Sequence, residues 1–282
     1  MAISAQLVKR LREETDAPMM ECKRSLEAAE NEGVSGDEAL IARAKEILKE
    51  TGKLAAVKRQ DRAVSVGTVA IGKSGNAAAA VSLLCETDFV ARNEDFIALA
   101  QTLADAFAAN DPGSDPLNST VGGKKVQDLL DEAVAKIREN IQLGTVVRMT
   151  SDGTVGGYLH HDKAKAALVA ISGSEEDIAK KLGTQIVALS PEFISKEGVD
   201  QERLSKMIEA ERQKAIEAGK PAEIAQKIAE GKVGKELLSE IVLLEQQWYA
   251  DLSKKVGDVI SGTVVFEFAR VEAGKQPIHA KA

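Results

Sequence analysis

The chain has 282 residues, of which 44% are hydrophobic and 3% are aromatic, so two or more packed units are expected. The formal net charge of −7 at pH 7 argues against a general nucleic-acid or membrane binder. No apolar run reaches the length of a membrane span, and the N-terminus lacks the apolar core of a signal peptide. These features predict a cytoplasmic protein whose two cysteines, Cys22 and Cys85, are reduced.

Three short helices are expected at the N-terminus. Pro18 suits the start of the second helix, over about residues 19–31, and a third helix is expected over about 37–50. Three helices in so short a stretch predict a small domain over residues 1–55. The basic stretch that follows, TGKLAAVKRQDR at 51–62, is expected to be a hinge or linker.

A β-hairpin is expected next. Residues 64–72 alternate as in a strand, residues 73–76 (KSGN) are typical of a turn, and residues 77–86 form a second apolar run. The spacing of apolar side chains then predicts a helix that starts at Asn93, and another over about 125–140.

The β pattern recurs over residues 145–172 and is again followed by a helix, over about 175–189. The stretch VGTVAIGKSGNAAAAVSL aligns with VGGYLHHDKAKAALVAI as one hairpin on another. We therefore predict an internal duplication, with two related α+β subdomains.

Long charged helices follow from residue 191. Gly219 suits the end of one helix and Pro221 the start of the next, and Ile224 and Ile228 continue the apolar pattern of the return arm. An antiparallel helical hairpin is therefore expected.

A last strand is expected in GTVVFEFARV, with Phe266 and Phe268 on one face, before a frayed tail. The fold class predicted is α+β with antiparallel sheets. Its expected parts are a three-helix domain (1–55), a core N-subdomain (56–145), a core C-subdomain (146–190 and 241–275), the helical hairpin (191–240) and the tail (276–282).

Residues 67–74, GTVAIGKS, fit the phosphate-binding P-loop pattern GxxxxGK[ST]. A P-loop needs a flexible loop between a buried strand and a helix. Here the four inner residues prefer an extended strand, and Gly75 and Asn76 after them are typical of a hairpin turn. The hairpin is the favoured interpretation, and a P-loop nucleotide-binding protein is the alternative.

The sequence offers few residues at spacings that suggest a catalytic site. His160 and His161 are adjacent and would point to opposite faces of a strand, which is wrong for a chelate. No Cys-His or Ser-His-Asp arrangement can be argued from spacing. We therefore expect no enzyme, no catalytic residue, no metal site and no cofactor.

The stretch LLCETDFVARNEDF, at residues 83–96, puts a large aromatic at a junction that is normally surface. Asn93 is the best helix cap, so Phe89 lies beyond the strand and outside the main helix. Phe89 either folds back onto the core or projects as an anchor for another molecule. Asp88 beside it should meet amides or a cation.

Met19 and Met20 occupy consecutive positions at a helix start, about 100° apart, so only one fits comfortably in a core. The other is a candidate contact, because methionine suits adaptable surfaces. The alternative is that both are buried. Arg12 shares this neighbourhood, and its alternative is an ordinary solvated arginine.

The segments LVKRLREETDAPMMECKRSL and TDFVARNEDF resemble the bacterial elongation factor Ts family. Four further stretches resemble it in the same order: KIRENI, GYLHHDKAKAALVAI, SPEFIS and AGKPAEIAQKIAEGK. The resemblance covers about residues 3–271. Members are guanine nucleotide exchange factors for elongation factor Tu in translation. The resemblance implies a ubiquitin-associated-like three-helix domain, a linker, two related α+β subdomains and a helical hairpin. It also implies that the factor itself binds no nucleotide.

The resemblance implies roles for residues 87–90. Thr87, Asp88, Phe89 and Val90 match the segment associated with displacing Mg²⁺ in Tu, and Phe89 would wedge between two helices of the Tu G domain. The expected partner is therefore Tu, in its GDP-bound and nucleotide-free forms.

Further contacts to Tu are implied for Arg12, Met19, Met20, Ile137 and His160. Two of these matches carry a departure. Arg138 stands beside Ile137 where the family usually has glycine, and His161 beside His160 leaves open which histidine makes the contact.

The helical hairpin matches an element implicated in dimerisation, so a homodimer or a Tu2–Ts2 assembly is a further expectation. Because the tail is short, the C-terminal helix of some members is expected to be absent. A generic helical adaptor is a third possibility, because the first 50 residues resemble a ubiquitin-associated domain.

Overall fold

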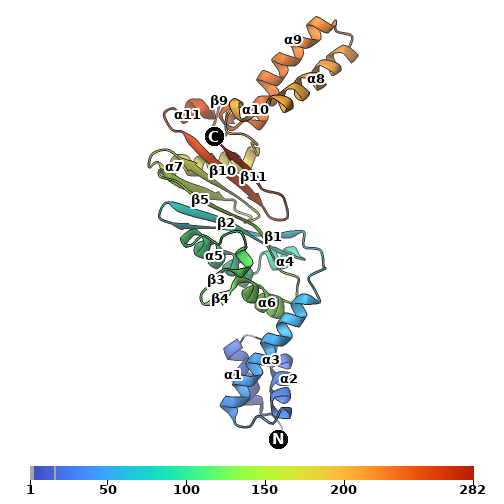
Figure 1. The fold of residues 1–282 in the computed structure, drawn as a ribbon, viewed down its shortest axis with the longest axis vertical. Helices are drawn as coiled ribbons and strands as arrows, with labels where there is room; N and C mark the ends of the chain where they lie inside the picture. Colours follow the sequence, from blue (N-terminus) through green and yellow to red (C-terminus); the bar gives the residue numbers. More distant parts are fainter. Residues whose placement is uncertain (1–2, 16) are drawn as a thin grey trace. The chain divides into compact units, whose positions relative to one another are not determined.

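The computed structural model describes residues 3–15 and 17–282, and its mixed helices and small antiparallel sheets agree with the predicted α+β class (Figure 1). Close contacts divide the chain into two units. Unit 1 holds the described residues up to Thr68 together with Leu83–Leu99 and Pro112–Gly144, and unit 2 holds Val69–Ser82, Ala100–Asp111 and Thr145–Ala282. The sequence-based domain boundaries stay a prediction.

Unit 1 begins with the three expected helices, α1 (Ala5–Thr15), α2 (Met19–Asn31) and α3 (Asp37–Val57). They enclose one apolar cluster, because the apolar residues of each helix recur on one face. Its buried members are Leu7, Val8, Leu11, Cys22, Leu26, Ala29, Leu40, Ile41 and Ala44.

Helix α3 runs further than predicted, since it continues to Val57 through the first half of the expected linker. The reason is a tertiary contact with α6 (Val126–Ile137). A Cβ on Gly52 would lie 3.1 Å from the Cβ of Ala135, and the Lys53 ammonium lies 2.7 Å from Asp128. This packing overrides the glycine that would locally have weakened the helix.

The rest of unit 1 contains α4 (Asp88–Ala91), the start of α5 (Glu94–Ala109), the turn η1 (Pro116–Asn118), the short strands β3 (Thr120–Val121) and β4 (Lys124–Lys125), and α6. Helix α6 ends at Ile137, three residues earlier than predicted, because Arg138 adopts a left-handed conformation with φ +70°.

The first sheet has the strand order β1 (Val66–Ser74), β2 (Ala77–Cys85) and β5 (Gln142–Thr150). The hairpin of β1 and β2 is as predicted. Strand β5, which the sequence pattern grouped with the second set of strands, instead pairs in this first sheet.

The P-loop alternative is wrong for this chain. Residues 67–74 lie inside β1, and a second strand rather than a helix follows the turn at Gly75. Gly72 serves close packing instead, because a Cβ there would lie 2.2 Å from the carbonyl oxygen of Ala104 in α5.

The second sheet, in unit 2, has the order β11 (Ile278–Lys281), β10 (Val265–Glu272), β7 (Lys165–Ile171) and β6 (Thr154–Leu159). Neighbouring strands are antiparallel. Alternate residues of β7 face two clusters: Ala167, Val169 and Ile171 pack with α7 (Glu176–Leu189), while Ala166, Leu168 and Ala170 pack against Val69, Ala78, Ala80 and Met149.

Two expectations for the last strands were wrong. Residues 278–281 are not frayed but form β11, whose Ala280 is buried opposite Phe268 of β10. Phe266 and Phe268 do not share a face, because a register shift at Phe266 leaves that side chain exposed while Val265 and Phe268 are buried. An extra residue in one strand reverses the alternation at that point.

The helical hairpin of unit 2 is confirmed. After the turn η2 (Lys196–Gly198), α8 (Gln201–Glu217) and α9 (Ala222–Lys232) pack side by side (Figure 1). Gly219 has φ +81° at the bend, as a helix-ending glycine does. The return arm turns Ala225 and Ala229 inward, and Ile224 and Ile228 are exposed.

The chain then continues through the π-helical turn η3 (Val233–Leu237), α10 (Leu238–Ile241) and the turn η4 (Leu243–Glu245). The small pair β8 (Gln247–Trp248) and β9 (Asp251–Lys255) and the short helix α11 (Val256–Val259) lead into β10. Each of the two aligned hairpins, β1–β2 and β6–β7, is followed by helix, as the predicted duplication requires.

Both cysteines are free, as predicted, and both are buried. Cys85 is the last residue of β2, and burial, reinforced by the nearby Glu139 carboxylate, raises the pKa of its thiol to about 12. The neutral thiol donates a hydrogen bond to the carbonyl oxygen of Thr87 at 3.2 Å.

Replacing Gly72 by alanine is expected to destabilise the protein by about 1–3 kcal/mol, because the added methyl group would push α5 away from β1. The matched control is Gly231→Ala in α9, where a Cβ meets nothing within 4 Å. That change should stabilise by about 0.5–1 kcal/mol, as alanine does in an exposed helix. Urea unfolding measures both, and equal stability of Gly72→Ala and wild type would contradict the packing role.

The Cys85 thiol should resist alkylation in the folded protein. Its pKa is raised from 9.0 to about 12, so the thiolate that reacts is scarce at pH 8.5, and labelling should be slower than in urea by a factor on the order of 100 or more. A raised folded-state pKa also means that this group's contribution to stability is complete below about pH 9 and is lost between about pH 9 and 12. Peptide mapping after iodoacetamide treatment measures the rate, and labelling of Cys85 as fast as in urea would refute the burial argument.

Candidate functional site

The stretch after β2 forms a single exposed helical turn. Thr87 is extended and caps α4, with its hydroxyl accepting from the amide of Val90 at 3.4 Å. Phe89 on this turn is 83% exposed, so it does not fold back onto the core. A phenylalanine left this open to water is unusual, and exposed aromatics are typical anchors of protein interfaces.

The turn ends at a second cap. The Asn93 side-chain oxygen accepts from the amides of Asp95 and Phe96, at 3.0 and 3.2 Å, where α5 begins. Asp88 is exposed and meets a cation as expected, since a carboxylate oxygen lies 3.5 Å from the Arg92 guanidinium. Residues 88–91 are thus held between two capped ends while none of them is buried.

Glu139 holds the first cap, although it was not among the residues predicted from the sequence. Its carboxylate accepts from the amides of Glu86 and Thr87 at 3.1 and 3.0 Å, and from the Thr87 hydroxyl at 2.6 Å. Glu139 belongs to KIRENI, the motif in which the resemblance points to Ile137 and Arg138. The signal available was a carboxylate placed directly after the end of a helix.

Ile137 and Arg138 precede Glu139. Ile137 is half-buried at the end of α6. Arg138 forms an ion pair with Glu21 and has the left-handed backbone that glycine adopts most readily. The chain therefore keeps the turn that the expected glycine would make, although arginine in this conformation costs about 1–2 kcal/mol.

The N-terminal candidates lie on the surface of unit 1. Met19 and Met20 are 51% and 57% exposed, so the expectation that one of them packs in the core was wrong. They precede Cys22, the first residue of α2 that faces the apolar cluster. Arg12 on α1 is exposed as well.

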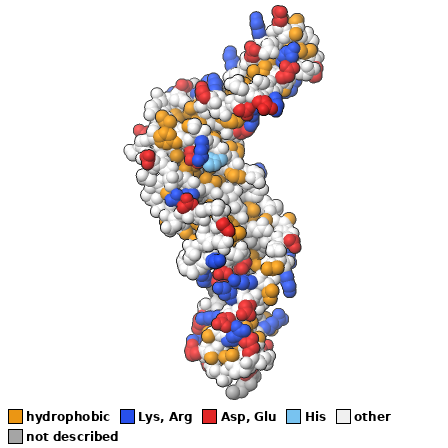
Figure 2. Space-filling model, in the orientation of Figure 1, with side chains coloured by type: hydrophobic (Ala, Val, Ile, Leu, Met, Phe, Trp, Pro, Cys, Tyr) orange, Lys and Arg blue, Asp and Glu red, His pale blue; other side chains and the backbone are white. Residues whose placement is uncertain are grey.

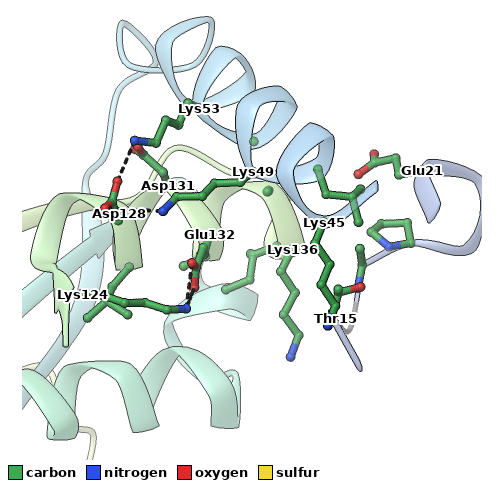
Figure 3. A pocket seen from close by; sticks show the side chains of 18 of the residues that line it. Thr15, Glu21, Lys45, Lys49, Lys53, Lys124, Asp128, Asp131, Glu132 and Lys136 are labelled. Carbon is green, nitrogen blue, oxygen red and sulfur yellow. Dashed lines mark hydrogen bonds and ion pairs between the residues drawn. The ribbon is translucent and has the colours of Figure 1, made fainter. Parts of the chain in front are cut away.

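A groove of about 650 Å³ lies between α3 and α6 within unit 1 (Figure 3). Lysines and carboxylates line it in pairs: Lys45–Glu14 at 2.7 Å, Lys53–Asp128 at 2.7 Å, Lys124–Glu132 at 2.8 Å and Lys136–Asp95 at 3.1 Å. Each of these ammonium groups is matched by a carboxylate. The groove therefore does not present the unbalanced positive charge that a phosphate site needs.

His160 belongs to unit 2, in the turn after β6. Its Nδ1 lies 3.1 Å from the Tyr158 hydroxyl oxygen, and its ring centroid lies 4.2 Å from that of His161. His160 lines a small cavity of about 190 Å³ with Tyr158, Lys165 and Thr184, while His161 is exposed. Because both lie in the turn rather than on a strand, their rings meet instead of pointing apart.

The described residues contain no group of three or more His, Cys, Asp or Glu side chains placed to hold a metal ion. Among the helices in the described ranges, none is both long and apolar enough to cross a bilayer. On the face drawn in Figure 2, acidic and basic side chains are interspersed over the N-terminal helices and the helical hairpin.

Comparison with known proteins identifies the family. The family model "Elongation factor TS" matches residues 86–275, which include the turn of Phe89, Glu139 and the helical hairpin. The chain is 36% identical over 280 residues to "Elongation factor Ts" of Idiomarina loihiensis, covering 98% of this chain and 92% of that protein.

Two further relatives carry the same name. "Elongation factor Ts" of Halorhodospira halophila is 36% identical over 283 residues, with 98% of this chain and 93% of the relative covered. The protein of an Azoarcus species is 40% identical over 257 residues, with 88% and 82% covered. The chain therefore belongs to the elongation factor Ts family of translation elongation factors.

Proposed function

We propose that the protein is a guanine nucleotide exchange factor for elongation factor Tu. It binds the Tu–GDP complex, inserts residues 87–90 into the G domain, displaces Mg²⁺ and promotes release of GDP so that GTP can bind. The observation that carries the proposal is the exposure of Phe89, at 83%, on a turn held at both ends within the part of the chain that matches the family.

The mechanism needs no catalytic side chain. GDP in a GTPase is held by backbone amides around its phosphates and by Mg²⁺, which offsets much of the phosphate charge. A phenylalanine forced between the helices that flank this site would misplace the ligands of the metal. Losing the ion and a few amide contacts weakens nucleotide binding, and each 1.4 kcal/mol of coupling corresponds to about tenfold in affinity.

Coupling of this kind is reciprocal. If the protein lowers the affinity of Tu for GDP, then GDP lowers the affinity of Tu for the protein by the same factor. The protein would stabilise nucleotide-free Tu and be displaced by GTP. It acts by binding alone in this proposal, with no reaction of its own and no cofactor.

The other sequence candidates extend the same interface. We assign further Tu contacts to Arg12, Met19 and Met20 on the N-terminal helices, to Ile137 at the end of α6, and to His160. The first three are exposed and offer one cation and two adaptable apolar side chains. Such an interface would form in the cytoplasm, and the helical hairpin would support a homodimer or a Tu2–Ts2 assembly.

Replacing Phe89 by alanine should slow protein-stimulated release of a fluorescent GDP analogue from Tu by about 30-fold or more, the effect of losing an interface anchor worth 2 kcal/mol or more. Thermal unfolding should stay within about 1 °C of wild type, because the side chain is exposed and packs little in the free protein.

The matched control is Leu252→Ala, which removes an exposed apolar side chain of unit 2 and should leave the release rate at the wild-type value. Equal rates for wild type and Phe89→Ala would refute the role of Phe89. A wild-type protein that fails to accelerate release, or that binds the analogue by itself, would refute the proposed function.

A further inference from the structure

We propose that Glu139 is a positioning residue, whose carboxylate fixes the turn of residues 87–90 and thereby aims Phe89 before Tu is bound. This inference rests on the proposed exchange function and adds to it the group that prepares the inserting segment. Helix α4 has only four residues, and none of them is buried. A single helical turn is unstable in water, so the turn needs support from outside itself.

Glu139 supplies that support at the N-terminal end of the turn. One carboxylate oxygen accepts from two consecutive backbone amides, Glu86 at 3.1 Å and Thr87 at 3.0 Å. The other accepts the Thr87 hydroxyl at 2.6 Å. Bonds to an ionised acceptor are stronger than neutral ones, so this carboxylate fixes the backbone where β2 ends.

The hydroxyl bond also orients the helix cap. A threonine hydroxyl has one proton, and here it points to Glu139. The oxygen lone pairs are then left for the amide of Val90, which donates to this oxygen at 3.4 Å. Glu139 therefore acts through Thr87 on the residue directly after Phe89.

Glu139 is itself held from two sides. The left-handed Arg138 turns the chain at the end of α6, where its amide donates to the carbonyl of Val134 at 2.8 Å. On the other side of Glu139, the Asn140 amide donates to the Glu86 carboxylate at 2.6 Å. Residues 139–140 and 86–87 are therefore joined by hydrogen bonds in both directions.

Asn140 extends the network to the chain before β1. Its side chain is only 3% exposed and donates to the carbonyl oxygens of Arg62 at 2.6 Å and Gln60 at 3.2 Å. The Arg62 guanidinium in turn lies 3.3 Å from the Glu86 carboxylate. Residues 60–62, 86–87 and 139–140 thus form one hydrogen-bonded block at the start of the turn that carries Phe89.

If the turn is already fixed in the free protein, binding to Tu costs less conformational entropy. A segment that is competent only part of the time binds with an affinity reduced by that fraction. Loss of the Glu139 carboxylate should therefore weaken exchange through Phe89, although Glu139 itself need not touch Tu.

The test is a double-mutant cycle on release of a fluorescent GDP analogue from Tu. Glu139→Gln turns one acceptor oxygen into a donor and should slow stimulated release by about tenfold. In the Phe89→Ala background the same change should slow release by less than about twofold, because its effect passes through Phe89. Glu46→Gln is the matched control, since it removes the charge of an exposed carboxylate on α3 and should exchange as wild type does.

A second measurement uses the free protein. Amide hydrogen exchange at Glu86, Thr87 and Val90 should quicken by about tenfold in Glu139→Gln and stay unchanged in Phe89→Ala. Thr87→Val, which keeps the shape of the side chain and removes its hydroxyl, should quicken exchange at Val90 and slow GDP release in the same direction. This variant keeps the inference testable if Glu139→Gln does not fold.

The outcomes separate the inference from the function on which it rests. The positioning role is overturned if wild type accelerates GDP release and the Glu139→Gln protein is equally fast. It is also overturned if Glu139→Gln slows release by the same factor in the Phe89→Ala background as in the wild-type background. If wild type fails to accelerate release, the proposed function fails. The hydrogen-exchange result then decides by itself whether Glu139 fixes the turn.

Discussion

The exposed position of Phe89 depends on three hydrogen bonds that one carboxylate, Glu139, accepts where β2 ends. Burying a phenylalanine side chain stabilises a fold by about 1.5–3 kcal/mol, and an exposed phenylalanine does not contribute this free energy. Polar contacts to the backbone must replace it. The structure supplies them from residues 139–140, far along the chain from the turn that they hold.

Helix α6 connects this block to the rest of unit 1. It packs against α3, with Lys53 and Asp128 in contact and Gly52 against Ala135. Its last residue leads through Arg138 to Glu139. One helix therefore supports both the continuous α3 and the polar block under Phe89, so that packing between helices and hydrogen bonding at the turn reinforce each other.

Much of this fold could be predicted from sequence, because helices and hairpins follow from local periodicity and turn residues. The caps at Asn93 and Gly219 and the hairpin of β1 and β2 are of this kind. What failed depended on distant partners. The extension of α3 needs α6, strand β11 needs β10, and the exposure of Phe266 needs a register shift that no alternation pattern reveals. Glu139 was missed for the same reason, since its partners lie more than 50 residues earlier.

The second sheet has an order of assembly built into its topology. Its inner strands are β7 and β10, and the chain from β10 to β11 spans residues 265–281. Strand β7 therefore waits for a partner made about 100 residues later. During synthesis β7 completes its pairing only when residues 265–272 have emerged, so a nascent chain stalled before residue 265 would expose an unpaired strand edge.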